Sequence, residues 1–228
     1  MIKPVNENSF LIILSDKIDL SLTAKIANIV KQIEFKLAKA LIDITPSYTT
    51  ILVQIDLLKI SPLVAEQLLV EIFHSTYQTQ NISSKLIELP VYYDVSVGWD
   101  LKKVASEKRL SIDDVITLHC EKIYQVCAVG FTPGFAFLAE LDDKIKTARH
   151  DSPRAFVPAG SVAIADSQTA VYPSDSPGGW HIIGNCPIPL FDLKNNPISP
   201  FKIGDQVTFS AINYLQFIEL GGKIIDEH

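Results

Sequence analysis

Residues 130–135 of this sequence combine residue types that could form a ligand pocket. They read Gly-Phe-Thr-Pro-Gly-Phe, so two glycines flank the Thr-Pro pair and an aromatic side chain follows each glycine. Glycine lets a ligand approach the backbone closely, and aromatic side chains can wall a pocket. The alternative is an ordinary turn with core aromatics, because Pro133-Gly134 also suits a type II turn. We take Phe131, Gly134 and Phe135 as candidate substrate-binding residues.

A second segment, residues 152–161, places an arginine before a turn that contains proline and glycine. Arg154 offers five N–H donors in a planar fork, which suits a carboxylate or a phosphate; a surface ion pair is the alternative. Ser161 follows Gly160 but lacks the Gly-x-Ser-x-Gly surroundings of an activated nucleophile. We therefore expect Arg154, Gly160 and Ser161 to contact a ligand without forming a covalent bond to it.

The third segment, residues 176–180, reads Ser-Pro-Gly-Gly-Trp. Gly178 and Gly179 can turn backbone N–H groups toward an anion, and Trp180 can cover it. A structural turn with a buried indole fits the same residues. A P-loop is excluded, because the glycine spacing that begins at Gly179 is not followed by Lys-Ser or Lys-Thr. Gly178, Gly179 and Trp180 complete the set of candidate substrate-binding residues.

The histidines and cysteines show no ligand spacing typical of a metal site, so we predict none. They are His74, His119, His150, His181 and His228, with Cys120, Cys127 and Cys186. His119 and Arg154 are the candidates for a catalytic role. His119 would need a carboxylate partner such as Asp94 or Asp175; the alternative is that its charge complements a helix C-terminus.

Composition excludes several classes of protein. The 228 residues include 26 acidic and 20 basic side chains, a formal charge of −6, which argues against binding to a nucleic-acid backbone. No apolar run approaches the ~20 residues of a membrane helix, and the first residues lack the pattern of a signal peptide. Three cysteines without a disulfide pattern favour reduced thiols, so we expect a cytoplasmic protein.

The distribution of glycine predicts two domains. All ten glycines lie at or beyond Gly98, so the first part should contain long elements and the second many short ones. In residues 1–89 the expected order is strand 10–14, a helix from Ser21, strands 41–45 and 49–57, a helix from Ser61-Pro62 and strand 86–93. This βαββαβ order predicts a ferredoxin-like α+β domain, with an isolated helical pair as the rival.

Residues 90–228 are expected to begin with short helices and continue as a β-barrel. Ser111 and Asp114 resemble a capping box at the start of a helix. Short strands separated by glycine and proline turns then predict a small closed or nearly closed barrel. The expected strands are 123–129, 161–165, 169–172, 180–183, 188–191 and 206–212.

Taken in order, these motifs resemble the family of 5-oxoprolinase B subunits, also called KipI or allophanate hydrolase subunit 1-like. The resemblance rests on 130–135, 152–154, 157–164, 172–173 and 176–180, and it is supported by 89–94 and 118–119. It covers most of residues 85–215. This chain departs from the family pattern at Ala139-Glu140, Ala148-Arg149, Asp166 and Ala170, and these departures affect the shape of the pocket more than the fold.

The resemblance implies that the barrel is cyclophilin-like and that the chain works with partner subunits C and A. The family opens the lactam of 5-oxo-L-proline with ATP and water, forming L-glutamate, ADP and phosphate. ATP is therefore the expected cofactor of the assembled complex, and it need not touch this chain. In that setting Arg154 would hold the substrate carboxylate. Two alternatives stay open: a KipI-type inhibitor that binds a sensor histidine kinase, and a prolyl isomerase suggested by the barrel alone.

Overall fold

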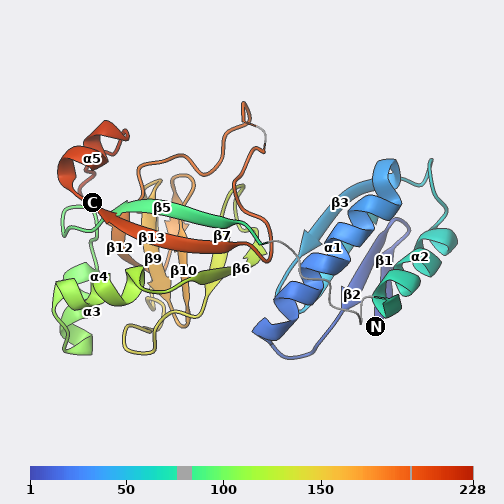
Figure 1. Ribbon diagram of the computed structural model, residues 1–228, viewed down its shortest axis with the longest axis horizontal. Coiled ribbons are helices and arrows are strands. Elements are labelled where there is room, and N and C mark those ends of the chain that lie inside the picture. Colours follow the sequence, from blue (N-terminus) through green and yellow to red (C-terminus); the bar gives the residue numbers. More distant parts are fainter. Residues whose placement is uncertain (76–83, 196, 228) are drawn as a thin grey trace. The chain divides into compact units, whose positions relative to one another are not determined.

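The computed structural model describes residues 1–75, 84–195 and 197–227. The chain divides into two compact units, Met1–Ser84 and Lys85–His228 (Figure 1). The predicted boundary at 89/90 would cut through a strand of the second unit. None of the helices in the described part of the chain is both long and apolar enough to cross a membrane.

The first unit is a four-stranded antiparallel sheet with two helices packed on it (Figure 1). The strand order is β1-β2-β4-β3. The elements are β1 (Ile2–Asn6), β2 (Ser9–Ile13), η1 (Leu20–Leu22), α1 (Thr23–Leu37), η2 (Ala38–Ala40), β3 (Leu41–Pro46), β4 (Thr50–Ile55) and α2 (Pro62–Ser75).

Helix α1 forms where the sequence places apolar residues three or four positions apart. Ile26, Ile29, Ile33 and Leu37 are buried on one face of the helix, as their spacing predicts. Strand β4 alternates in the same way, with Ile51, Val53 and Ile55 buried. These alternating faces meet in the core of the unit, and the predicted positions of α1, α2, β2, β3 and β4 are confirmed.

The predicted βαββαβ order of this unit is wrong. Its observed order is ββαββα, because β1 was not predicted and the strand expected to close the domain lies elsewhere. β1 is an edge strand with mostly exposed residues and Pro4 within it, so it carries no buried alternation that could be recognised. The strand β5 (Leu86–Tyr92) pairs with strands of the second unit.

The second unit is a closed seven-stranded barrel, as the glycine-rich half predicts. Its strand order is β10-β7-β6-β13-β5-β12-β9, and β9 closes the barrel on β10. The strands are β5, β6 (Tyr124–Val129), β7 (Ala136–Ala139), β9 (Ser161–Ala165), β10 (Gln168–Val171), β12 (His181–Asn185) and β13 (Gln206–Ile212). A separate two-stranded sheet joins β8 (Arg154–Val157) to β11 (Ser176–Gly178). That the barrel is cyclophilin-like stays a prediction.

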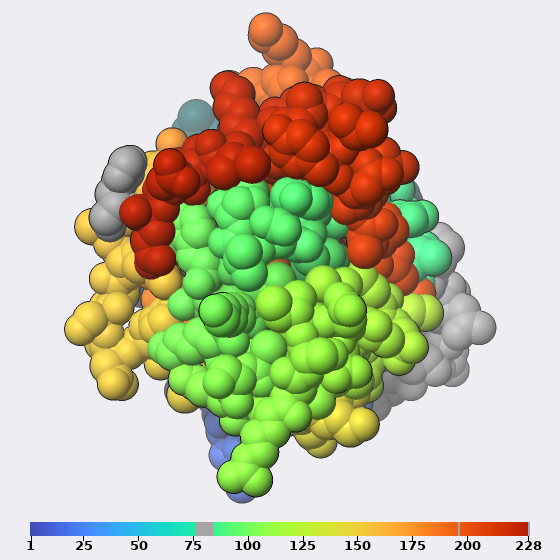
Figure 2. Space-filling model, turned by 90° about the vertical axis from the view of Figure 1, so that its left-hand side faces the viewer, coloured from blue at the N-terminus to red at the C-terminus, as the bar shows by residue number. Residues whose placement is uncertain are grey.

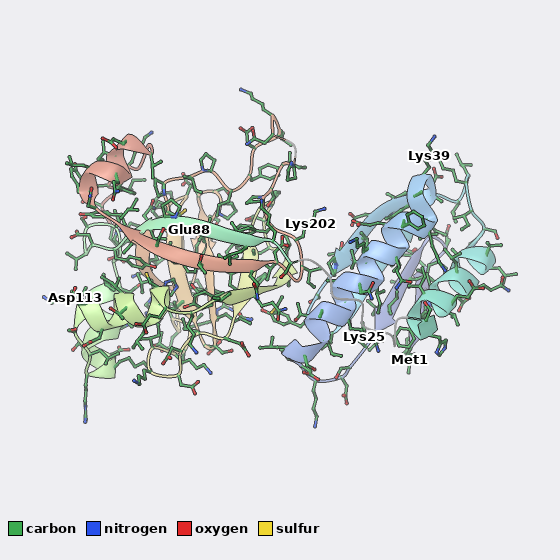
Figure 3. All side chains as sticks on the ribbon, viewed as in Figure 1. Met1, Lys25, Lys39, Glu88, Asp113 and Lys202 are labelled. Carbon is green, nitrogen blue, oxygen red and sulfur yellow. The ribbon has the colours of Figure 1, made fainter. Side chains whose placement is uncertain are left out.

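Strand β5 owes its place in the barrel to β13, which lies about 120 residues further along the chain. The two strands pair in parallel, from Leu86 opposite Gln206 to Tyr92 opposite Ile212. Along β5 the residues Ile87, Leu89 and Val91 point into the core, whereas Glu88, labelled in Figure 3, is exposed. A buried alternation can be met by either domain, so only the pairing partner decides the domain to which β5 belongs.

Three helices accompany the barrel: α3 (Leu101–Lys108), α4 (Ile112–Cys120) and α5 (Tyr214–Glu219). The predicted capping box is confirmed, because Ser111 and Asp114 exchange hydrogen bonds at the start of α4. Asp113, labelled in Figure 3, also lies in this first turn, where a carboxylate favours the positive end of the helix dipole. Leu101, Val104 and Val115 anchor α3 and α4 on the barrel core.

The strand predicted over residues 188–191 is wrong. These residues form a loop in which Leu190 is buried, and Pro187 and Pro189 explain the failure because neither has an N–H to donate to a neighbouring strand. Strands β7, β8 and β11 were not predicted. Each is only three or four residues long, too short for an alternating pattern to stand out.

Candidate functional site

A hollow with a volume of about 350 Å³ opens between the turns that precede β7 and β12. Its walls include the side chains of Phe131, Phe135, Phe137, Tyr172, Trp180 and Arg149, and we call it the aromatic hollow. Gly178 and Gly179 also line it. Five of the predicted substrate-binding residues therefore meet at one place, although they come from segments about 45 residues apart.

Phe135 organises the wall of the aromatic hollow. Its ring lies edge-on to Phe137, Tyr172 and Trp180, with centroid distances of 4.9, 5.3 and 6.0 Å. Edge-to-face packing of this kind is favourable and keeps the rings in fixed orientations. Phe131 stands at the rim with 64% of its surface exposed, 5.3 Å from the ring of Phe135.

The backbone of Phe131 is in the left-handed region, with φ at 75°. A bulky side chain rarely adopts this conformation, which costs of order 1–3 kcal/mol, and such strain is concentrated at binding and catalytic sites. The surrounding turn holds it in place, since Phe135 N–H donates to the Thr132 carbonyl and Gly130 N–H to the Phe135 carbonyl. The strain therefore keeps an exposed aromatic ring at the mouth of the hollow.

Arg149 supplies the positive charge of the aromatic hollow. It is exposed, and within the described residues no carboxylate forms an ion pair with it. Burial raises the pKa of Tyr172, and the charge of Arg149 acts in the opposite direction. A free guanidinium beside aromatic rings suits a small ligand that carries a carboxylate. Sequence reasoning noticed Arg149 only as a departure from the family pattern and did not select it.

The four predicted glycines have different roles. A Cβ at Gly178 would collide with the Tyr172 hydroxyl, whereas one at Gly179 would lie an ordinary 3.7 Å from Arg149 Nη2. Gly134 and Gly160 have φ of 85° and 82°, and their missing Cβ atoms make room for backbone carbonyls of the neighbouring loop. Gly134 and Gly160 are thus turn residues and do not line the aromatic hollow.

Ser161 faces the interior of the barrel. It is completely buried, and its hydroxyl has no hydrogen-bond partner among the described residues. This position is incompatible with the predicted ligand contact, because strand β9 is buried along its whole length. The expectation that Ser161 is no nucleophile agrees with its burial.

His119 is also a core residue. Its Nε2 lies 2.8 Å from Thr169 Oγ1 and its Nδ1 2.7 Å from the Tyr93 hydroxyl. Thr169 donates its own proton to the Ala163 carbonyl, so Nε2 carries the hydrogen and Nδ1 accepts from Tyr93. Burial lowers the pKa of His119 to about 3. His119 is therefore neutral, fully hydrogen-bonded and remote from solvent, which removes it as an acid–base candidate.

Arg154 is engaged by other residues of the chain. Its Nη1 and Nη2 each donate to one oxygen of Asp100 at 2.9 Å, and its Nε donates to Glu227 at 2.7 Å. It does not line the aromatic hollow. The predicted role as receiver of a ligand carboxylate does not fit this geometry, because protein carboxylates already fill the fork.

Asp100 is the centre of a buried polar cluster. Only 3% of it is exposed, and it also accepts the backbone N–H of Ile182 at 2.8 Å. Burial by itself would raise the pKa of Asp100, but the hydrogen bonds from Arg154 and Ile182 outweigh this and leave the pKa below its ordinary value. Asp100 is thus a carboxylate held ionised inside the protein.

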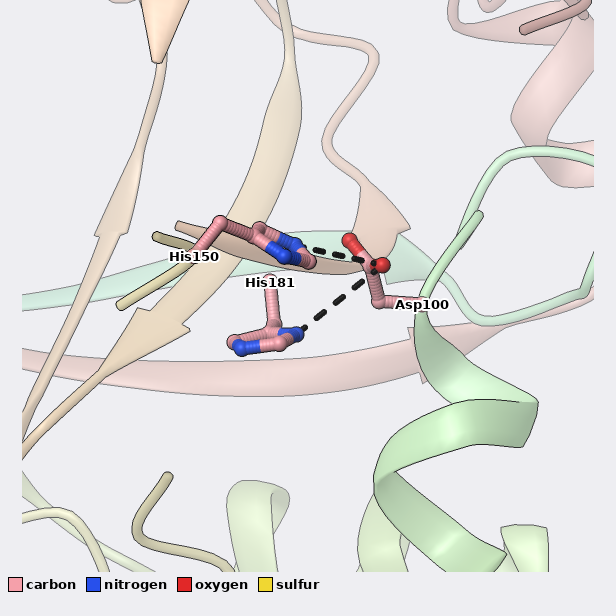
Figure 4. A group of neighbouring side chains, drawn as sticks. All are labelled: Asp100, His150 and His181. Carbon is pink, nitrogen blue, oxygen red and sulfur yellow. Dashed lines mark ion pairs between the residues drawn. The ribbon is translucent and has the colours of Figure 1, made fainter. Parts of the chain in front are cut away.

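Two histidines complete this cluster, with their rings stacked 3.9 Å apart (Figure 4). His150 Nε2 lies 3.3 Å and His181 Nδ1 3.9 Å from the same oxygen of Asp100. His150 N–H donates to the carbonyl of Gly179, which connects the cluster to the rim of the aromatic hollow. No sequence pattern pointed to this group, because its members are separated by 50 and 31 positions and meet only when the barrel closes. His74 is exposed on α2, and His228 lies outside the described residues.

The C-terminal segment covers the exposed side of this cluster. Trp99 Nε1 donates to the carbonyl of Ile225 at 3.2 Å, and Glu227 binds Arg154. In Figure 2 the red C-terminal residues form an arc over the green segment that follows β5. A second hollow, of about 370 Å³, lies between this segment and the loop that contains Cys186. Burial raises the pKa of the Cys186 thiol to about 12, so it offers no reactive thiolate.

Comparison with protein families places this architecture among known ones. Residues 1–201 match the model of the family described as carboxyltransferase domain, subdomain C and D. Among solved structures, TTHA0988 superposes with a TM-score of 0.78 at 30% identity, covering 93% of this chain and 40% of that one.

Two sequence relatives carry the same description. The chain is 42% identical over 132 residues to the 5-oxoprolinase B subunit of Bacillus subtilis (strain 168), which covers 58% of this chain and 55% of that protein. It is 40% identical over 144 residues to the 5-oxoprolinase B subunit of Haemophilus influenzae, which covers 63% of this chain and 65% of that protein. Each match spans less than two thirds of the relative's length.

Proposed function

The chain belongs to the family of the carboxyltransferase domain, subdomain C and D, and from this premise we propose that it is the B subunit of an ATP-dependent 5-oxoprolinase. In this proposal the complex opens the lactam ring of 5-oxo-L-proline with ATP and water, and it releases L-glutamate, ADP and phosphate. The names of the relatives from Bacillus subtilis and Haemophilus influenzae support the subunit assignment and do not favour an inhibitor of a histidine kinase.

The observation that carries the proposal is an unpaired arginine at the rim of an aromatic hollow. A 5-oxoproline molecule is a small, flat ring with one carboxylate. Arg149 can receive the carboxylate through two N–H groups, while Phe135, Tyr172 and Trp180 contact the faces and edges of the ring. The volume of about 350 Å³ is ample for such a ligand.

The lining of the hollow also supports dependence on partner subunits. Among the described residues that line it there is no histidine, cysteine, serine or lysine, so this chain offers no imidazole, thiol, hydroxymethyl or amine nucleophile there. We assign to this chain the binding and orientation of the substrate, and to subunits A and C the handling of ATP and the proton transfers. Arg149 thus takes the role that the sequence led us to assign to Arg154.

Reconstitution tests the proposed function. This chain is mixed with candidate A and C subunits, and phosphate release is measured with and without 5-oxoproline. We expect 5-oxoproline-dependent phosphate release only when all three chains are present. Equal activity without this chain, or a preference for a different amide, would refute the assignment.

A further inference from the structure

Three side chains with metal-ligating atoms converge in the Asp100 cluster, and the aromatic hollow does not use them. Asp100 precedes α3, His150 lies in the loop before β8, and His181 begins β12. One ligand atom from each lies within 4.8 Å of the other two. The side chains of Asp100 and His181 are each 4% exposed and that of His150 is 16% exposed, so the group is shielded but can be reached from one side.

His181 is oriented as a ligand would be. Its Nε2 lies 2.9 Å from the carbonyl of Ala148, so Nε2 carries the hydrogen and the lone pair is on Nδ1. Histidines that bind metals commonly donate their other ring N–H to a backbone carbonyl in this way. Nδ1 is buried, has no hydrogen-bond partner among the described residues and faces Asp100, 3.9 Å away (Figure 4).

An unpaired lone pair that faces a carboxylate is unfavourable in a buried place, and a bound cation would satisfy both groups. Burial also lowers the pKa of His181, which keeps the ring neutral and able to bind a metal ion.

We propose that Asp100, His150 and His181 form a binding site for a first-row divalent metal ion, with Zn²⁺ the best match to two imidazoles and one carboxylate. Zinc binds such ligands at about 2.0–2.2 Å, so ligand atoms in a tetrahedral site lie roughly 3.3 Å apart. The observed 3.3 and 3.9 Å require only small movements to reach that geometry. Water would occupy the fourth position. This inference does not depend on the proposed function.

Arg154 is a built-in competitor for the proposed site. Its Nη1 lies 2.9 Å from both Asp100 Oδ2 and His150 Nε2, and its Nη2 donates to Asp100 Oδ1. A metal ion would take Oδ1 and the His150 nitrogen, and Arg154 would keep Oδ2 and its bond to Glu227. Because the guanidinium repels a cation, its removal should tighten metal binding, which adventitious binding to surface histidines would not show.

Titration of the metal-free full-length chain with Co²⁺, followed by displacement with Zn²⁺, tests the proposal. We expect one equivalent of Co²⁺ to give the visible absorption of a four-coordinate site. We expect His150→Ala to weaken binding at least 100-fold, His74→Ala to leave it unchanged, and Arg154→Met to tighten it at least 10-fold. His181→Gln should behave as His150→Ala does, and His150→Ala decides the matter if the buried variant fails to fold.

Several outcomes would overturn the proposal. They are the absence of Co²⁺ and Zn²⁺ binding, binding that His150→Ala leaves intact, and binding that His74→Ala weakens as strongly as His150→Ala. A metal affinity that does not rise in Arg154→Met would show that the bound ion does not share the Asp100 carboxylate. A thermal-unfolding shift on adding Zn²⁺, lost in His150→Ala, provides a readout independent of the absorption.

Discussion

Arg154 grips both carboxylate oxygens of Asp100 through two hydrogen bonds of 2.9 Å, although the two residues are 54 positions apart. Because Asp100 also accepts the N–H of Ile182, this pair links the start of α3 to β8 and β12. The pair therefore stabilises the barrel unit and also sets the charge balance of the cluster beside the aromatic hollow.

Arg154→Met should destabilise the barrel unit by about 3 kcal/mol, because it leaves the carboxylate of Asp100 buried without its partner. Urea unfolding followed by tryptophan fluorescence measures this unit directly, since Trp99 and Trp180 both belong to it. Lys103→Met is the control, because it breaks only an exposed pair with Glu107 and should cost less than about 0.5 kcal/mol. Equal costs for the two variants would show that the pair contributes no more than a surface ion pair.

His119 should make the barrel unit less stable as the pH falls from about 6.5 to about 3. Its folded pKa of about 3 lies below the unfolded value of about 6.5, so in this range the unfolded state binds a proton that the folded state does not. The free energy of unfolding should then fall by up to about 1.4 kcal/mol per pH unit from this residue alone. His119→Gln should reduce the slope measured between pH 6 and 4, and His74→Gln should not change it. A slope that both variants share with the parent would place the titration at another group, such as His181.

Arg149→Ala should raise the KM of the reconstituted complex for 5-oxoproline by about 10- to 100-fold, which corresponds to the loss of charge-assisted hydrogen bonds worth about 1.5–3 kcal/mol. Lys144→Ala is the control, since it removes an exposed positive charge from the same region. Arg149→Lys should recover part of the affinity, because it keeps the charge and loses the planar fork. An unchanged KM in Arg149→Ala would move the carboxylate site away from the aromatic hollow.

Gly178→Ala and Gly179→Ala should differ although the residues are adjacent. At Gly178 a methyl group would collide with the Tyr172 hydroxyl, so we expect a loss of about 1–3 kcal/mol from overpacking. At Gly179 the nearest atom would be 3.7 Å away, so we expect a change below about 0.5 kcal/mol. Urea unfolding of the two variants side by side measures the difference. Similar stabilities would mean that Tyr172 moves easily and does not hold the wall of the hollow.

Features encoded within a few neighbouring residues could be predicted from the sequence. The spacing of Ile26, Ile29 and Ile33 predicts the buried face of α1, and Ser111 with Asp114 predicts the start of α4. The glycines and prolines after Gly98 predict a barrel of short strands. Each of these signals acts over one or two turns of chain, where propensity, capping and turn chemistry are decided locally.

Only the tertiary structure decided which distant residues meet. β5 carries an alternation that fits either unit, and its pairing with β13 settles the matter. Arg154 has a fork suited to any carboxylate, and the closed barrel offers it Asp100, which leaves Arg149 as the unpaired charge of the hollow. His119 and Ser161 have reactive side chains, but the barrel surrounds them with core residues. The physical reason is that hydrogen bonding and burial depend on neighbours brought together by folding, and a local sequence pattern specifies which groups are available without specifying their partners.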